Sequence, residues 1–223
     1  DKNFNNLIIT ASGGPFLKKN FTDLKKVTFE QAINHPKWKM GYKNSIDSAT
    51  LVNKCLEIVE AHYLFNIPYE KINILVHPQA LVHSIINKNN YVTNYNLFKN
   101  DMNIPLLNFL MISSNTVKEV KNLNLPSFSN LEFIKVDQKV FPIYKYFLKL
   151  DKYNPSNIIK FNVGNEHAVN MFKNKLIKYT DIYKIIKKVV SLNLNSPLNS
   201  IKDVINYHEE IEKKIKVLNK NIS

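Results

Sequence analysis

The sequence predicts an α/β fold class, in which a mixed α+β domain comes first and a bundle of α-helices follows. Three observations predict this order. Short apolar or alternating runs typical of strands all lie within the first hundred residues. From residue 140 onward, the apolar residues recur with helical spacing. A chain of 223 residues is also long enough to bury a sizeable core in one or two domains.

We therefore expect one domain at residues 1–113, a connection at residues 114–139 and a helical domain at residues 140–223. Residues 116–138 indicate the connection because they carry Pro126 and several Ser and Asn residues without a regular pattern. Such segments are typical of interdomain boundaries.

The first elements are a strand, a turn and a helix. Residues 6–10 contain the apolar run Leu7-Ile8-Ile9, which indicates a buried strand. The turn Gly13-Gly14-Pro15 ends it. A Gly-Gly pair in a chain with four glycines indicates a backbone that needs positive φ or approaches a ligand closely. A helix is expected over residues 21–34, because His35-Pro36 should end it.

A second helix is predicted to begin at Asp47 or Ser48, since either side chain suits an N-cap. The segment Asn66-Ile67-Pro68 should end it. Its buried stripe is expected to consist of Leu51, Val52, Cys55, Leu56, Val59, Tyr63 and Leu64.

Further strands and helices complete the predicted order. Alternating apolar residues indicate strands at residues 71–76, 81–86 and 91–97. Helical spacing indicates helices at residues 105–112, 141–150, 165–175, 180–192 and 201–218. The segment Gly164-Asn165-Glu166 is expected to cap the helix at 165–175.

Charge and cysteine content limit the class of function. The net charge is +13, and all 31 basic residues are Lys. Nucleic-acid readers use Arg for bidentate contacts, so nucleic acid is not the expected partner. The only cysteine, Cys55, excludes an internal disulfide and favours a reducing compartment. No signal peptide and no apolar run of about 20 residues is visible, and no membrane partner is expected. The amphipathic, Lys-rich helix at residues 201–218 is expected to pack on the protein, and the alternative is a membrane-surface or coiled-coil helix.

The turn at Ser12-Gly13-Gly14 is a candidate phosphate-binding site. It follows the first predicted strand, and backbone amides beside a serine hydroxyl suit phosphate oxygens. The alternative interpretation is a tight connection with no ligand.

The helix predicted after Ser48 carries a second candidate site. Lys54 and Glu57 are three residues apart and Asn53 and Glu57 are four apart, so these side chains project from one side. Ser48, Asn53 and Lys54 could bind a phosphate near the helix start, and Glu57 could hold a divalent metal. The alternative is an amphipathic helix with a Lys54–Glu57 surface pair.

Residues 35–41 are a candidate lid. They hold the only tryptophan, Trp38, between lysines, and His35 could donate a hydrogen bond to an anion. An exposed Trp in a loop needs a partner to cover it, which a lid closing over substrate would supply. The alternative is a Trp that anchors an ordinary loop on the core.

Two other reactive residue types are interpreted as structural. His77 and His83 are six residues apart, and a metal pair is the less common outcome of that spacing. Cys55 falls within the predicted buried stripe, which favours packing over nucleophilic chemistry.

Together these blocks resemble the 1-deoxy-D-xylulose 5-phosphate reductoisomerase family. The resemblance is carried by SGGPF at residues 12–16, HPKWKMG at 35–41 and IDSATLVNKCLE at 46–57, and continues through VHPQALVHS at 76–84, DMNIP at 101–105 and NVGNEHAV at 162–169. It implies an NADPH-dependent oxidoreductase and isomerase of non-mevalonate isoprenoid biosynthesis. Such an enzyme converts 1-deoxy-D-xylulose 5-phosphate to 2-C-methyl-D-erythritol 4-phosphate with Mg²⁺ or Mn²⁺, as a homodimer.

The resemblance also implies roles for individual residues. Substrate-binding roles fall to Ser12, His35, Ser48, Asn53, Lys54 and Glu57. The flap indole would be Trp38, the contacts near the nicotinamide would be Met40 and Gly41, and one of three acidic metal ligands would be Glu57.

Departures from the family pattern qualify these expectations. Only the catalytic and C-terminal domains are matched. The family's nucleotide-binding domain and its other metal ligands are not found, so the chain alone is expected to be inactive. Cys55, Ala80 and Asn100 stand where Gly, Ser and Pro are usual. The family implies the bacterial cytoplasm or a plastid-type organelle. The rival interpretations are a basic polyanion-binding module and a degenerate phosphosugar-binding homologue without redox activity.

Overall fold

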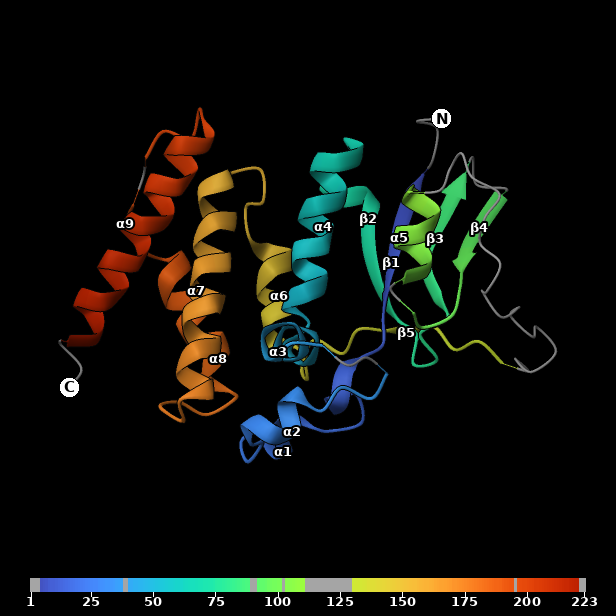
Figure 1. The fold of residues 1–223 in the computed structure, drawn as a ribbon, viewed down its shortest axis with the longest axis horizontal. Coiled ribbons are helices and arrows are strands. Elements are labelled where there is room, and N and C mark those ends of the chain that lie inside the picture. Colours follow the sequence, from blue (N-terminus) through green and yellow to red (C-terminus); the bar gives the residue numbers. More distant parts are fainter. Residues whose placement is uncertain are drawn as a thin grey trace.

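A computed structural model describes residues 5–37, 40–88, 92–101, 103–110, 130–194 and 196–220. In this part of the chain, five strands form one sheet in the order β4-β3-β1-β2-β5. The strands are β1 (Asn6–Ala11), β2 (Ile72–Val76), β3 (Val82–Lys88), β4 (Val92–Leu97) and β5 (Ile134–Lys135). Figure 1 shows the sheet at one end of the molecule and the later helices at the other.

The central strand β1 defines where the first site candidate lies. It pairs in parallel with β2, Leu7 opposite Ile72, and antiparallel with β3, Leu7 opposite Ile86. Because β1 and β2 are parallel, their carboxyl ends meet at the same edge of the sheet, where α/β proteins usually bind ligands. The predicted strands at residues 6–10, 71–76, 81–86 and 91–97 are confirmed, with ends shifted by one or two residues.

The helix predicted over residues 21–34 is wrong, because this segment forms two short helices. They are α1 (Phe21–Leu24) and α2 (Phe29–Ile33). Each begins with its own capping box, in which Asn20 pairs with Asp23 and Thr28 with Gln31. Two N-terminal caps eight residues apart leave room for little more than one turn in the first helix.

The start predicted for the next helix, at Asp47 or Ser48, is also wrong. The chain forms α3 (Tyr42–Thr50) and then α4 (Val52–Phe65), separated by Leu51 alone. Leu51 has a left-handed backbone, with φ of 67° and ψ of 10°. Asp47 and Ser48 therefore lie inside α3, and the helix that carries Asn53 and Lys54 begins after the turn at Leu51.

The predicted buried stripe of α4 is correct in its first half. Leu51, Val52 and Cys55 are buried. Tyr63 and Leu64 are instead 60% and 75% exposed, which corrects the prediction. Leu64 and Phe65, in the last turn of α4, line an open hollow beside Leu7 and Ile9 of β1, and Asn66 ends the helix in a left-handed conformation.

The later helices confirm the predicted helical part and shift one start. They are α6 (Pro142–Lys149), α7 (Pro155–Lys173), α8 (Asp181–Val190) and α9 (Ile201–Lys220), after α5 (Asn103–Leu110) at the sheet end. The prediction that α7 begins at Asn165, capped by Gly164-Asn165-Glu166, is wrong. The side chain of Asn154 caps α7, and Pro155 occupies its first turn. Gly164 lies mid-helix, where an added Cβ would come within 3.0 Å of Val189 on α8.

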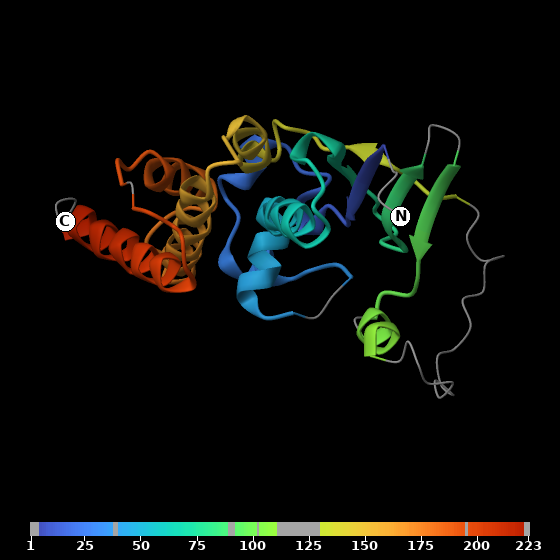
Figure 2. The same ribbon diagram turned by 90° about the horizontal axis from the view of Figure 1, so that it is seen from above.

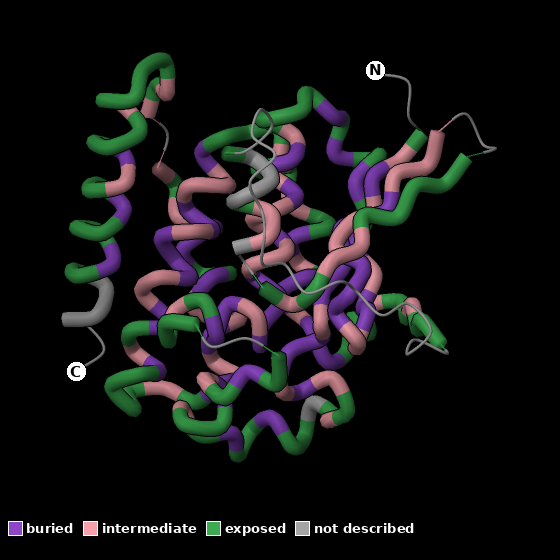
Figure 3. Tube along the Cα trace, turned by 45° about the vertical axis from the view of Figure 1, so that its right-hand side comes forward, coloured by how far each residue is buried: buried purple, intermediate pink, exposed green. Residues whose placement is uncertain are grey.

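The apolar core joins the sheet and the helices. One cluster of buried side chains runs from Leu7 on β1 through Phe147 on α6 to Ile186 on α8. A smaller cluster holds α9 through Tyr207, Ile211 and its neighbours. Figure 2 shows α9 as the outermost helix, and Figure 3 shows its buried positions confined to one side.

The predicted α/β fold class with a following group of helices is confirmed. The boundaries at residues 113 and 139 remain predictions, and the connection from residue 114 to 129, including Pro126, lies outside the described residues. Among the described helices, none is long and apolar enough to cross a bilayer.

Candidate functional site

A cavity of about 400 Å³ lies at the carboxyl end of β1, between the sheet, α3 and the start of α4. It is lined by Thr10, Ala11, Ser12, His35, Met40, Asn44, Ser48, Leu51, Asn53, Lys54, Glu57, Ala80 and His83. The serine turn, the imidazole and the early helix face, predicted from separate motifs, thus meet in one cavity. Gly41 does not line the cavity but is the N-cap residue of α3, and Trp38 lies outside the described residues.

Ser12 and His35 form the polar corner beside the sheet. The backbone N–H of Lys37 donates to His35 Nδ1 at 3.2 Å. The ring proton therefore lies on Nε2, which donates to Ser12 Oγ across 3.1 Å. The N–H of Gly14 also donates to Ser12 Oγ, at 3.2 Å. Both lone pairs of the hydroxyl are used, so its hydrogen is available for an acceptor in the cavity.

Burial keeps His35 neutral. The residue is 9% exposed, and this desolvation lowers the pKa of the imidazole below its ordinary value. A neutral ring with its proton fixed on Nε2 orients Ser12 and adds no charge. Electrostatic attraction for an anion must therefore come from elsewhere in the cavity.

The two glycines of the turn have the predicted conformation. Gly13 has φ of 84° and Gly14 has φ of 62°, both in the left-handed region that favours glycine. Gly14 also lies against α3, where an added Cβ would come within 3.1 Å of the Ser48 carbonyl oxygen. The turn therefore fixes the distance between Ser12 and the helix that carries Ser48.

Lys54 supplies the positive charge. Its Nζ lies 2.9 Å from Glu57 Oε1 and 2.8 Å from Oε2, and Asn53 Nδ2 donates to Oε1 at 2.6 Å. The Lys54 and Glu57 side chains are 21% and 30% exposed, and both line the cavity. The alternative interpretation expected a Lys54–Glu57 pair on the outer surface. The pair is present, but both side chains line the cavity. The first turn of α4 borders the same cavity, and the backbone N–H groups at a helix start favour an anion.

A divalent metal does not fit the described residues on their own. No group of three or more His, Cys, Asp or Glu side chains that could hold a metal occurs among them. Among the residues that the structure describes, Glu57 is the only carboxylate that lines the cavity, and both its oxygens already accept hydrogen bonds. Since Mg²⁺ takes about six oxygen ligands, Glu57 can supply one ligand at most.

The histidines and the cysteine are held as structural residues. His77 is fully buried, with Nδ1 at 2.8 Å from the Glu132 carbonyl oxygen. His83 lines the cavity, stacked 3.7 Å from the Phe98 ring with Nε2 directed to the Phe98 carbonyl. Cys55 is fully buried, and burial raises the pKa of its thiol well above the ordinary value.

Sequence reasoning missed several residues of the cavity wall, namely Thr10, Asn44, Ala80 and the cavity side of His83. The spacing of Asn44 and Ser48 could have revealed Asn44, because residues four apart share a helix face. That signal required a helix beginning at Tyr42. Ala80 has a left-handed backbone with φ of 53°, which no local motif indicates.

Comparisons with known proteins match this chain along its length. A family model for the 1-deoxy-D-xylulose 5-phosphate reductoisomerase C-terminal domain matches residues 1–65, and one for the DXP reductoisomerase C-terminal domain matches residues 97–214. The 1-deoxy-D-xylulose 5-phosphate reductoisomerase of Clostridium novyi is 38% identical over 96% of this chain and 56% of its own length. The enzyme of Sulfurihydrogenibium is 37% identical over 96% and 59%.

Solved structures give the same result. The reductoisomerase from Zymomonas mobilis in complex with NADPH has a TM-score of 0.86 and 32% identity, over 97% of this chain and 56% of that one. A DOX-P reductoisomerase in complex with NADPH, fosmidomycin and magnesium has a TM-score of 0.84 and 31% identity, with the same coverage. The chain spans about half the length of the relatives it matches. It therefore belongs to the 1-deoxy-D-xylulose 5-phosphate reductoisomerase family and matches that family's C-terminal domains.

Proposed function

We propose that the chain provides the phosphate pocket of an enzyme that converts 1-deoxy-D-xylulose 5-phosphate to 2-C-methyl-D-erythritol 4-phosphate with NADPH and Mg²⁺ or Mn²⁺. The observation that carries this proposal is that Ser12, Ser48, Asn53 and Lys54 all line one cavity. These residues come from three separate elements, and a phosphorylated sugar needs such a convergent set of donors. The proposed reaction follows from the relatives, which are 1-deoxy-D-xylulose 5-phosphate reductoisomerases.

The proposed role of the pocket is to bind the phosphate and orient the sugar. Lys54 would form a charge-assisted bond, and the hydroxyls of Ser12 and Ser48 and the amide of Asn53 would complete the set. The phosphate lies away from the reacting carbons, so its binding energy can be used for orientation and closure. His35 would keep Ser12 oriented, since its ring is neutral and fixed by two hydrogen bonds.

The resemblance is the basis for proposing NADPH and Mg²⁺ or Mn²⁺ as cofactors. Met40 is 38% exposed and lines the cavity, and no atom lies within 4 Å of an added Cβ at Gly41. This open edge fits the face of a nicotinamide ring, which would supply hydride. Glu57 would be one ligand of a metal whose other ligands are not among the described residues. We also propose a homodimer in the cytoplasm or a plastid-type organelle, following the family.

A chimera tests the proposal. The part of the Clostridium novyi enzyme that this chain does not match is joined to the chain, and NADPH oxidation is measured with 1-deoxy-D-xylulose 5-phosphate and Mg²⁺. Substrate-dependent oxidation supports the proposal. A folded chimera that neither binds the substrate nor oxidises NADPH refutes it. Binding without oxidation supports the degenerate homologue, and salt-dependent binding of arbitrary RNA instead of substrate supports the polyanion module.

A further inference from the structure

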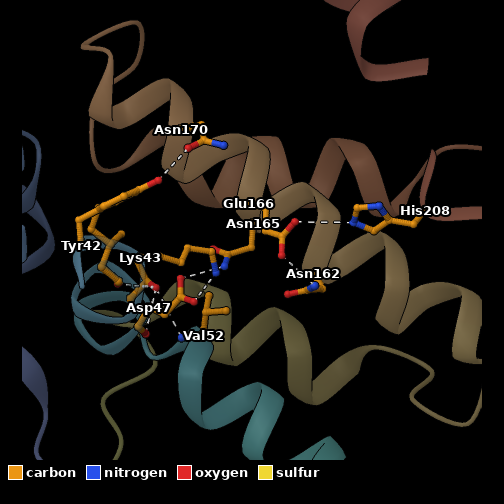
Figure 4. A network of polar contacts seen from close by, with 11 residues as sticks. Tyr42, Lys43, Asp47, Val52, Asn162, Asn165, Glu166, Asn170 and His208 are labelled. Atoms are coloured by element: carbon orange, nitrogen blue, oxygen red, sulfur yellow. Dashed lines mark hydrogen bonds and ion pairs between the residues drawn. The ribbon is translucent and has the colours of Figure 1, made fainter. Parts of the chain in front are cut away.

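Helix α3 has a second polar face, directed away from the cavity. Asp47 lies on it and is 3% exposed. Asn165, in the middle of α7, is fully buried, and its Nδ2 donates to Asp47 Oδ1 at 2.9 Å. Lys43, one turn before Asp47, donates to Oδ2. Figure 4 shows the side chains of Asn165, from α7, and Lys43, from α3, both reaching the Asp47 carboxylate.

This acid is costly where it lies. Burial raises the pKa of the Asp47 carboxyl, and the Lys43 charge and the Asn165 hydrogen bond only partly oppose that effect. Apolar side chains of similar volume often give equal or greater stability than a buried polar contact of this kind. The contact is therefore better explained by the orientation of α3 against α7 that it specifies than by a gain in stability. A carboxylate can accept from Asn165 in only a narrow range of helix rotations, whereas apolar packing tolerates many.

The contact is coupled to the cavity through α3 itself. Ser48 follows Asp47 and projects into the cavity, and the buried hydroxyl of Tyr179 donates to the Ala49 carbonyl oxygen at 2.7 Å. Thr50 Oγ1 donates to the Asp47 carbonyl oxygen at 3.3 Å and accepts from the Val52 N–H at 3.5 Å. A rotation of α3 would therefore move Ser48 and the first turn of α4 together.

We infer that Asp47 and Asn165 form a positioning pair, which fixes the rotation of α3 so that Ser48 and Lys54 can bind the same phosphate. The inference rests on the proposed function for the identity of the ligand. It assigns no contact with substrate to either residue. The later helices would then serve the pocket directly, through α7, and would not be only a support for the sheet.

Exchange of the two side chains tests the pair. Asn165→Asp places two carboxyls against each other and should weaken phosphate binding about tenfold, the loss expected for about 1.4 kcal/mol. Asp47→Asn places two amides against each other. Asn165 Oδ1, which has no hydrogen-bond partner among the described residues, could then accept from the new amide N–H. The double variant Asp47→Asn/Asn165→Asp restores an acid–amide contact with reversed direction. Its phosphate affinity should return to within about threefold of the original.

Two readouts separate this inference from the proposed function. The dissociation constant of inorganic phosphate is measured by NMR titration of the chain. The amide resonance and hydrogen exchange of Ser48 are measured without ligand. A chain that binds no phosphate contradicts the proposed function, whereas the Ser48 readout still tests the pair. Asn165→Asp should displace the Ser48 resonance, and the double variant should restore it. If Asn165→Asp fails to fold, Asn165→Leu removes the donor without adding a charge.

Tyr207→Phe is the matched control. The Tyr207 hydroxyl bonds to Ser156 at the start of α7 and donates to the Leu194 carbonyl oxygen at 2.7 Å, so its loss loosens the opposite side of α7. This variant should lower the unfolding temperature and leave phosphate affinity and the Ser48 resonance unchanged. Three results overturn the inference: wild-type behaviour of Asn165→Asp, failure of the double variant to recover, or an equal loss of affinity in Tyr207→Phe.

Discussion

Replacement of Lys54 by Met separates binding from stability. In the folded chain Lys54 forms an ion pair with Glu57 within one helix, and such pairs contribute about 0.3–0.5 kcal/mol when partly exposed. For a protein of this size, that loss lowers the unfolding temperature by about 1–2 °C. In the cavity the same ammonium group would form a charge-assisted bond to phosphate, which contributes about 1.5–3 kcal/mol. The expected loss of phosphate affinity is therefore about 10- to 150-fold.

The loss should be largest when Glu57 keeps its charge. Without Lys54, the Glu57 carboxylate faces the phosphate with no cation between them, so Lys54→Met/Glu57→Gln should bind phosphate more tightly than Lys54→Met alone. Isothermal titration with inorganic phosphate measures both. Lys184→Met is the control, because Lys184 pairs with Asp181 at the same spacing, at 2.7 Å, on the surface of α8. Unchanged affinity in Lys54→Met, or an equal loss in Lys184→Met, would refute the reasoning.

Four further predictions concern stability and reactivity. Cys55 should resist a thiol reagent at pH 8 in the folded chain and react on unfolding, because burial raises its pKa. Lys175→Gly should raise the unfolding temperature by about 2–4 °C, since Lys175 has φ of 59° at the end of α7 and glycine removes a strain of about 1 kcal/mol. Gly164→Ala should lower the free energy of unfolding by about 1–3 kcal/mol, because the added Cβ would press on Val189 of α8. Gly41→Ala should change it little, because no atom lies within 4 Å of the added Cβ, and calorimetry measures both. In His35→Gln, the free energy of unfolding should fall less steeply as the pH drops below 6.5, as urea titrations would measure. The pKa of His35 is lowered in the folded chain, so the unfolded chain binds the proton first and acid favours unfolding of the original protein.

The elements of the sheet and the site motifs could be predicted because local patterns specify them. Alternation identified β2, and glycine scarcity made the turn at Gly13 conspicuous. The resemblance then gathered Ser12, His35 and Lys54 into one site, and the cavity brings these residues together. Their roles in binding remain predictions, as does the flap role of Trp38.

The break at Leu51 could not be predicted, because apolar spacing continues through α3 and α4 and leucine rarely adopts a left-handed backbone. Tertiary contacts at Gly14 and Tyr179 hold it in place. The start of α7 could have been recognised. Asn154 and Pro155 are a standard cap and first-turn pair, but the weak apolar stripe around Lys160 and Asn162 concealed the helix that follows.

The turn at Leu51 limits how this segment can change in length. Ser48 and Lys54 belong to separate helices joined through a single residue, so one inserted residue after Leu51 would turn the face of α4 by about 100°. Lys54 and Glu57 would then leave the cavity while Ser48 stayed. Related chains should therefore tolerate substitutions between residues 48 and 57 far better than insertions or deletions.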